Sequence, residues 1–185
     1  MNRNKTDIRK HAATLNVPVF KGMKMDRYPD ETTIFFAQDE CRFVGFAYAS
    51  PCVKEEVEKR VKDNITLMQC GLKTSGCINA DNCVRFLETY SSDEFDFHIY
   101  VADLMTQDGN DVRCTRILQA FFHEPRLNDL YMVSFGMGVF HSSDDSIKPF
   151  VIDRENDAIL RECEESLKII LNGVRYKDDQ VPILH

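Results

Sequence analysis

Side chains that could do chemistry are concentrated in residues 88–111. This stretch holds seven carboxylates and no lysine or arginine. Such a concentration of negative charge raises the association rate with a basic partner and disfavours acidic ones. A solvated edge hairpin that uses charge to prevent strand-to-strand aggregation would give the same composition. The acids are Glu88, Asp93, Glu94, Asp96, Asp103, Asp108 and Asp111.

Within this stretch Asp96, His98 and Tyr100 alternate with apolar residues, so they share one face of a predicted strand. An acid, an imidazole and a phenol in a row could orient a base or bind a ligand. No nucleophile accompanies them at a fixed spacing, so a polar sheet face or the centre of a protein interface is favoured. The predicted partner-binding residues are Glu88, Tyr90, Asp93, Glu94, Asp96, His98, Tyr100 and Asp103.

The cysteines offer an enzymatic alternative. Seven cysteines, an odd number scattered through predicted elements, are typical of reduced thiols. Cys52 follows Ser50 and Pro51, a favourable helix start, and a first-turn position would lower its thiol pKa and make it a nucleophile. Cys70, Cys77 and Cys83 could hold a metal, although the paired spacing of zinc knuckles is absent. The main prediction has no catalytic residue, metal or cofactor.

The elements that would position these residues follow from hydrophobic periodicity. Two strands at 32–38 and 42–50 form a predicted hairpin, and four more form an antiparallel meander. Helical spacing of apolar residues predicts one helix over 51–70, ending at Gly71, and another from about Asp153 to Gly173. Glycines 136 and 138 lie inside a strand and indicate a bulge or a close backbone contact. The meander strands are 82–90, 95–104, 112–123 and 130–140.

Length and composition favour one domain over residues 1–185. The chain is 43% hydrophobic and 29% charged, without repeats, and its weakest patterns lie at 1–16 and 174–185. A formal net charge of -7 argues against nucleic acid as a partner. No apolar run resembles a signal peptide or a membrane span, so we expect a cytosolic protein.

Strands, one helix, a four-stranded meander and a final helix predict an α+β domain: an antiparallel sheet with two long amphipathic helices packed on it. This element order resembles the PsbP-like fold, which includes DcrB-like and Eag-type chaperones. The resemblance is carried by the strand pair around 32–50, the helix after Ser50 and Pro51, the meander and the helix after residue 152. It implies work in binding other proteins, since members of that fold are mostly adaptors, chaperones or assembly factors.

The sequence therefore predicts a non-enzymatic binding protein that engages a basic protein, such as a toxin or a secreted effector, through an acidic surface. An immunity protein, an antitoxin or a secretion chaperone would act in this way. A thiol-dependent enzyme at Cys52, a metal site and a self-associating subunit are the alternatives. The oligomeric state is left open by the sequence.

Overall fold

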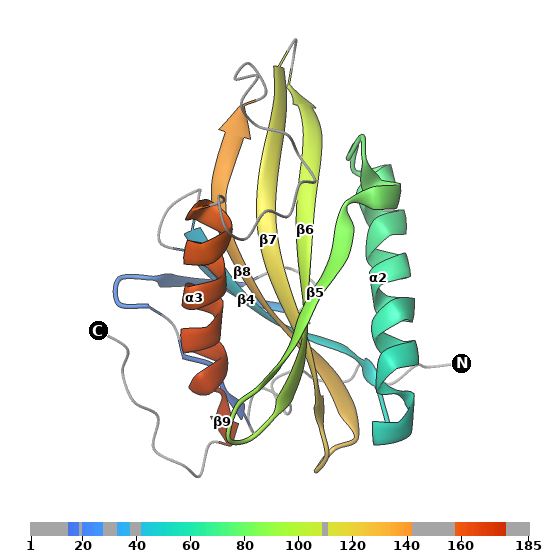
Figure 1. The fold of residues 1–185 in the computed structure, drawn as a ribbon, viewed down its shortest axis with the longest axis vertical. Helices are drawn as coiled ribbons and strands as arrows, with labels where there is room; N and C mark the ends of the chain where they lie inside the picture. Colours follow the sequence, from blue (N-terminus) through green and yellow to red (C-terminus); the bar gives the residue numbers. More distant parts are fainter. Residues whose placement is uncertain are drawn as a thin grey trace.

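The computed structural model describes residues 15–18, 20–27, 33–37, 42–108, 111–141 and 158–176. Within these residues, seven strands form one antiparallel sheet (Figure 1), and two short strands form a second sheet. The α+β class and the antiparallel meander predicted from the sequence are confirmed. In spatial order the strands of the large sheet are β2 (Lys24–Arg27), β3 (Thr33–Ala37), β4 (Arg42–Pro51), β8 (Asp129–His141), β7 (Asp111–Glu124), β6 (Asp96–Asp108) and β5 (Val84–Ser91).

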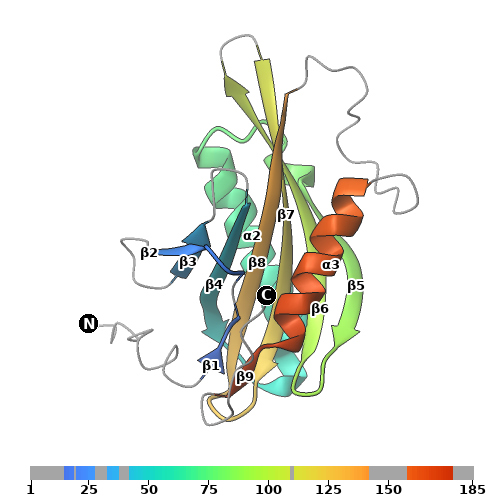
Figure 2. The same ribbon diagram turned by 90° about the vertical axis from the view of Figure 1, so that its left-hand side faces the viewer.

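Two helices lie on opposite faces of this sheet (Figure 2). Helix α3 (Ala158–Asn172) covers the main hydrophobic core, and this side is called the α3 face. Helix α2 (Val57–Thr74) packs against a smaller cluster on the other side, called the α2 face. Strand alternation decides which residues take part, because successive side chains point to opposite faces. Phe97, Ile99 and Val101 of β6 therefore lie under α3.

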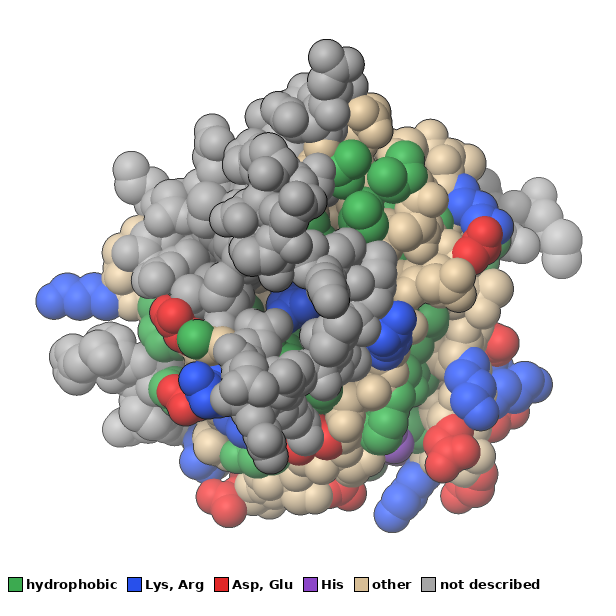
Figure 3. Space-filling model, turned by 45° about the horizontal axis from the view of Figure 1, so that its top comes forward, with side chains coloured by type: hydrophobic (Ala, Val, Ile, Leu, Met, Phe, Trp, Pro, Cys, Tyr) green, Lys and Arg blue, Asp and Glu red, His purple; other side chains and the backbone are tan. Residues whose placement is uncertain are grey.

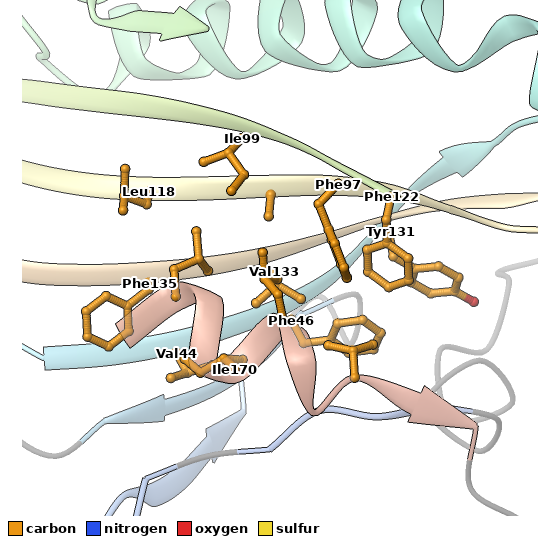
Figure 4. Close-up of a cluster of buried hydrophobic side chains, with 14 of the residues drawn as sticks. Val44, Phe46, Phe97, Ile99, Leu118, Phe122, Tyr131, Val133, Phe135 and Ile170 are labelled. Atoms are coloured by element: carbon orange, nitrogen blue, oxygen red, sulfur yellow. The ribbon is translucent and has the colours of Figure 1, made fainter. Parts of the chain in front are cut away.

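The core on the α3 face is formed by β4, β6, β7, β8 and α3 (Figure 4). The predicted apolar stripe of the last helix supplies five buried residues: Leu160, Cys163, Leu167, Ile170 and Leu171. The helix ends before Gly173, as predicted; a side chain there would meet Pro18, because a Cβ would lie 2.5 Å from the Pro18 Cγ. Asp153, where the last helix was predicted to begin, lies outside the described residues.

Helix α2 packs more lightly on the sheet, since Val61 is its one buried residue. The predicted start at Ser50 and Pro51 is wrong, because both residues belong to β4 and Pro51 pairs with Asp129 of β8. A 3-10 turn, Lys54–Glu56, precedes the α-helix. The predicted stop at Gly71 is also wrong; the helix continues to Thr74, and the Gly71 carbonyl accepts the Ser75 N–H.

The predicted loose ends of the chain are partly ordered, contrary to expectation. Strand β1 (Leu15–Asn16) pairs with β9 (Arg175–Tyr176), and Leu15, Val174 and Tyr176 are buried in the main core. These strands could not be predicted from alternation in the sequence, because each has only two residues. The pairing partner of β1 comes from the other end of the described chain.

The predicted irregularity at Gly136 is present. The β7–β8 register shifts between Thr115 and Ile117, and Ile117 pairs with Gly136. The Phe43 ring lies over this glycine, since a Cβ there would be 2.0 Å from a ring atom. The close contact is therefore with a neighbouring side chain, and glycine leaves the space that the ring occupies.

Candidate functional site

The predicted partner-binding residues are divided between the two faces of the β5–β6 hairpin. Glu88 and Tyr90 pair with Ile99 and Phe97, so they lie on the α3 face. The Glu88 carboxylate is 2.7 Å from Lys168 Nζ. The Tyr90 hydroxyl donates to Asn172 Oδ1 at 2.7 Å. Both side chains thus hold β5 against α3, contrary to the prediction that they form part of a free docking surface.

Asp103 is also buried, whereas the sequence prediction placed it on the docking surface. It is 3% exposed and forms a bidentate ion pair with Arg116 of the neighbouring strand, itself 8% exposed. Arg116 Nε donates to Asp103 Oδ1 at 2.7 Å and Nη2 donates to Oδ2 at 2.9 Å. This carboxylate is therefore neutralised inside the protein and is not available to a partner.

The turn between β5 and β6 retains the exposed acids. Asp93, Glu94 and Asp96 are all exposed. Arg175 Nη2 approaches Asp93 at 4.0 Å, the limit of an ion pair, and the Asp93 side chain is 92% exposed. The Ser91 hydroxyl donates to Asp96 Oδ1 at 2.6 Å. On the face shown in Figure 3, acidic and basic side chains of the described residues lie intermixed.

The predicted row of Asp96, His98 and Tyr100 does share one face, the α2 face. Across the ladder these residues pair with Ser91, Thr89 and Phe86 of the edge strand β5. His98 and Tyr100 are half-buried, whereas Asp96 and Thr89 are exposed. The hairpin face is defined here as Phe86, Thr89, Asp96, His98 and Tyr100.

Phe86 is the aromatic residue of this face that was not among the predicted partner-binding residues; Thr89 was not among them either. The Phe86 side chain is 55% exposed and meets the Tyr100 ring edge to face, with centroids 5.4 Å apart. Tyr100 in turn contacts Phe121 at 6.0 Å. The register of β5 shifts between Phe86 and Glu88, which places Phe86 on the α2 face and Glu88 on the other. A simple alternation from the sequence would have put both on one side.

The electrostatics of the hairpin face are set by burial and by helix α2. Burial raises the pKa of the Tyr100 phenol, and the negative charge of Glu58 on α2 raises it further. The phenol is therefore neutral at physiological pH and available as a hydrogen-bond donor. Glu58 itself is exposed on α2.

Cys52 lies outside any helix, contrary to prediction. It follows β4, and its N–H donates to the Asn128 carbonyl at 2.7 Å. The thiol is 3% exposed and burial raises its pKa, with Arg60 opposing and Glu56 and Asp129 adding to the shift. No hydrogen bond joins Cys52 to a histidine in the described part of the chain. These surroundings suppress the thiolate that a nucleophile requires.

The three cysteines proposed as a metal site are in different surroundings. Cys70 is exposed on α2, whereas Cys77 and Cys83 are buried in the connection to β5. Cys77 Sγ donates to Asn79 Oδ1 at 3.0 Å, and burial raises the pKa of Cys83 to about 11. Among the described residues no three His, Cys, Asp or Glu side chains are placed to hold a metal ion.

Comparison with known proteins adds no relative. No protein-family model matches the sequence, and a search of curated proteins gives no match. None of the helices within the described residues combines the length and apolar character needed to cross a bilayer.

Proposed function

We propose that this is a cytosolic, non-enzymatic binding protein that docks a basic protein partner on the hairpin face, in the manner of an immunity protein, an antitoxin or a secretion chaperone. The observation that carries the proposal is Phe86, a large aromatic residue 55% exposed on an edge strand and supported by Tyr100. Exposed aromatic residues of this kind are typical anchors of protein interfaces. The resemblance to the PsbP-like fold supports a binding role.

The energetic contribution of such an anchor can be estimated from its exposed area. A phenylalanine buries roughly 150–250 Å² when fully covered, and Phe86 has about half of its surface left to bury. At about 25 cal/mol per Å², covering it contributes about 2–3 kcal/mol. A neighbouring Tyr100, which is half-buried already, loses little conformational freedom on binding.

The exposed acids of the β5–β6 turn would guide the partner to this face. Asp93, Glu94 and Asp96 keep their carboxylates in solvent, while Glu88 and Asp103 are paired internally. Exposed charges act mainly on the association rate and are screened by salt. Steering is therefore assigned to Asp93 and Glu94 of the turn and to Asp96 at the start of β6, rather than to the whole of residues 88–111.

The proposal is tested by quantitative affinity capture from cells that produce the protein. Phe86→Ser should remove the specifically captured partner, because the anchor is lost. Leu67→Ser is the matched control, since Leu67 is an apolar residue on α2 that is 70% exposed and is not one of the five residues that define the hairpin face. A captured set that is identical for Phe86→Ser, Leu67→Ser and the natural protein would reject the hairpin face as the docking site.

Once a partner is in hand, the charge contribution is measured separately. Replacing Asp93, Glu94 and Asp96 by lysine should lower the association rate at least about tenfold at low salt, with a much smaller effect at high salt. An unchanged association rate in the triple variant would show that the turn does not steer binding, even if Phe86 remains the anchor.

A further inference from the structure

Strand β5 forms one edge of the seven-stranded sheet, and β6 is the one strand that pairs with it within the described residues. None of the eight residues of β5 is buried: four are half-buried and four are exposed. A sheet edge offers its backbone groups to any other strand, so natural proteins protect such edges with proline, lysine, a bulge or a covering element. β5 has neither proline nor lysine. Its exposed edge is therefore a surface on which a further strand could pair.

The hydrogen-bond pattern of the hairpin shows which backbone groups of β5 point outward. Where the turn begins, the Ser92 N–H donates to the Phe95 carbonyl at 2.9 Å. Hydrogen-bonded and non-bonded positions alternate along an antiparallel ladder, so Ser91 and Thr89 occupy non-bonded positions opposite β6. The N–H and C=O groups of these two residues are therefore directed away from β6, toward the outer edge of the sheet.

The regular part of this edge is short and has chemically different ends. The β5–β6 register shifts between Phe86 and Glu88, and a bulge of this kind interrupts pairing on the strand that carries it. A regular added strand is therefore limited to residues 88–91, with the exposed Phe86 just beyond one end. The turn that carries Asp93 and Glu94, both exposed, lies just beyond the other end. The edge thus presents an apolar ring at one end and carboxylates at the other.

An extended, basic segment of the partner matches this edge. Strand addition gains main-chain hydrogen bonds, while side chains at alternate positions supply specificity. Phe86 and Asp93 are seven positions apart, or about 24 Å along an extended chain. A segment of similar length can therefore place an apolar side chain beside Phe86 and basic side chains beside the carboxylates of the turn. A second copy of this chain is a poorer occupant, because each copy has a net charge of -7 and like charges repel.

We infer that β5 receives an extended segment of the basic partner as an added antiparallel strand, hydrogen-bonded to the backbone of Thr89 and Ser91. This inference rests on the proposed function and specifies how the partner is bound. The antiparallel direction is assigned because every described strand of the large sheet is antiparallel to its neighbours, and this pairing is slightly more stable than the parallel one. The partner segment then begins with basic residues beside the turn and reaches its apolar residue about six or seven positions later, beside Phe86.

The test uses a synthetic peptide, titrated into the full-length protein and followed by NMR. The probe is an acetylated and amidated octapeptide: two lysines, then threonine and valine in alternation, and a final phenylalanine. We expect saturable shifts of the Thr89 and Ser91 backbone amides, with a dissociation constant below about 1 mM. The same residues in reverse order should bind about tenfold more weakly, since the lysines of an antiparallel strand then lie beside Phe86. Equal affinity of the two peptides, or no saturable shift at about 1 mM, would overturn the inference.

N-methylation of the probe tests the main-chain hydrogen bonds without any change to the protein. In an added strand one set of alternate N–H groups faces β5, and the other set faces solvent. Methylating the first set should abolish binding, whereas methylating the second should change the affinity by less than about threefold. Equal effects of the two sets would mean that the peptide does not pair with β5 as a strand.

A proline variant makes the same test on the protein. Thr89→Pro removes an outward N–H at an edge position, where proline leaves the β5–β6 ladder bonded, and it should weaken the peptide at least about tenfold. Thr89→Ala is the matched control, since it keeps the backbone N–H and should bind the peptide as the natural protein does. Thermal unfolding verifies that both variants are folded. Equal peptide binding by folded Thr89→Pro and Thr89→Ala would contradict the inference.

Affinity capture separates this inference from the proposed function. If the partner is lost in Phe86→Ser but kept in Thr89→Pro, the hairpin face stands and the added strand is wrong. If Phe86→Ser leaves capture intact, the proposed function fails. Loss of the partner in Phe86→Ser and Thr89→Pro, with capture retained by Thr89→Ala, supports both. A dimer of the natural protein in sedimentation that dissociates in Thr89→Pro would place a second copy on the edge and overturn the inference.

Discussion

The Asp103–Arg116 ion pair gives the sharpest prediction about this molecule, because it separates a structural role from a binding role. Asp103→Ala leaves the Arg116 guanidinium buried without its bidentate partner. Breaking a buried pair by removing one member costs about 3–5 kcal/mol, since the remaining charge is uncompensated. We therefore expect a loss of this size in the free energy of unfolding.

This loss corresponds to a measurable change in melting temperature. For a chain of 185 residues the entropy of unfolding is about 0.4 kcal/mol per kelvin. A loss of 3–5 kcal/mol should therefore lower the midpoint of thermal unfolding by about 8–12 °C. Replacing both members, as in Asp103→Leu with Arg116→Met, should recover most of the stability, because no buried charge is left.

Circular dichroism during urea and thermal unfolding measures these effects. Glu94→Ala is the control, since Glu94 is exposed in the β5–β6 turn and its loss should change stability by less than about 0.5 kcal/mol. A loss below about 1 kcal/mol for Asp103→Ala would refute the buried ion pair. Reduced partner binding by folded Asp103→Ala at unchanged stability would restore Asp103 to the docking surface.

Three further predictions concern the thiols and the β7–β8 turn. Iodoacetamide should label Cys70, which is exposed, at least about a hundredfold faster than Cys83 at pH 8, and equal rates by peptide mass spectrometry would contradict the burial of Cys83. Because the pKa of Cys83 is raised from 9.0 to about 11, its contribution to stability is present below pH 9 and is lost as pH rises to 11. In the Cys83→Ala variant, the free energy of unfolding measured in urea should therefore fall less steeply with pH between pH 9 and pH 11. An unchanged dependence on pH would argue against the raised pKa. Tyr176→Phe removes the hydroxyl that donates at 2.7 Å to the fully buried Glu124 carboxylate, and it should lower the free energy of unfolding by about 2 kcal/mol. Tyr90→Phe is the control: its hydroxyl is exposed, so urea unfolding should show a loss of less than about 1 kcal/mol.

Part of the fold was predictable from the sequence, because it depends on local periodicity. Alternation along 95–104 predicted a strand with one buried face, and the structure buries Phe97, Ile99 and Val101 there. Helical spacing predicted the apolar stripe of α3 and its end at Gly173. These features depend on residues close together in the chain.

The start of α2 was not predictable in the same way. Ser50 and Pro51 have the composition of a helix start, but their backbone pairs with β8, about 80 residues further along the chain. Long-range pairing outweighed the local capping preference, and it removed Cys52 from the position in which its pKa would fall.

The sequence by itself determined the α+β class, the strand faces and the presence of unusually many carboxylates in residues 88–111. The tertiary structure alone decided which of those carboxylates face solvent, because the counter-charges Arg116 and Lys168 come from β7 and α3. It also decided the orientation of Phe86, through the register shift in β5. Charge can be counted along a chain, but neutralisation and exposure depend on which distant segments pack together.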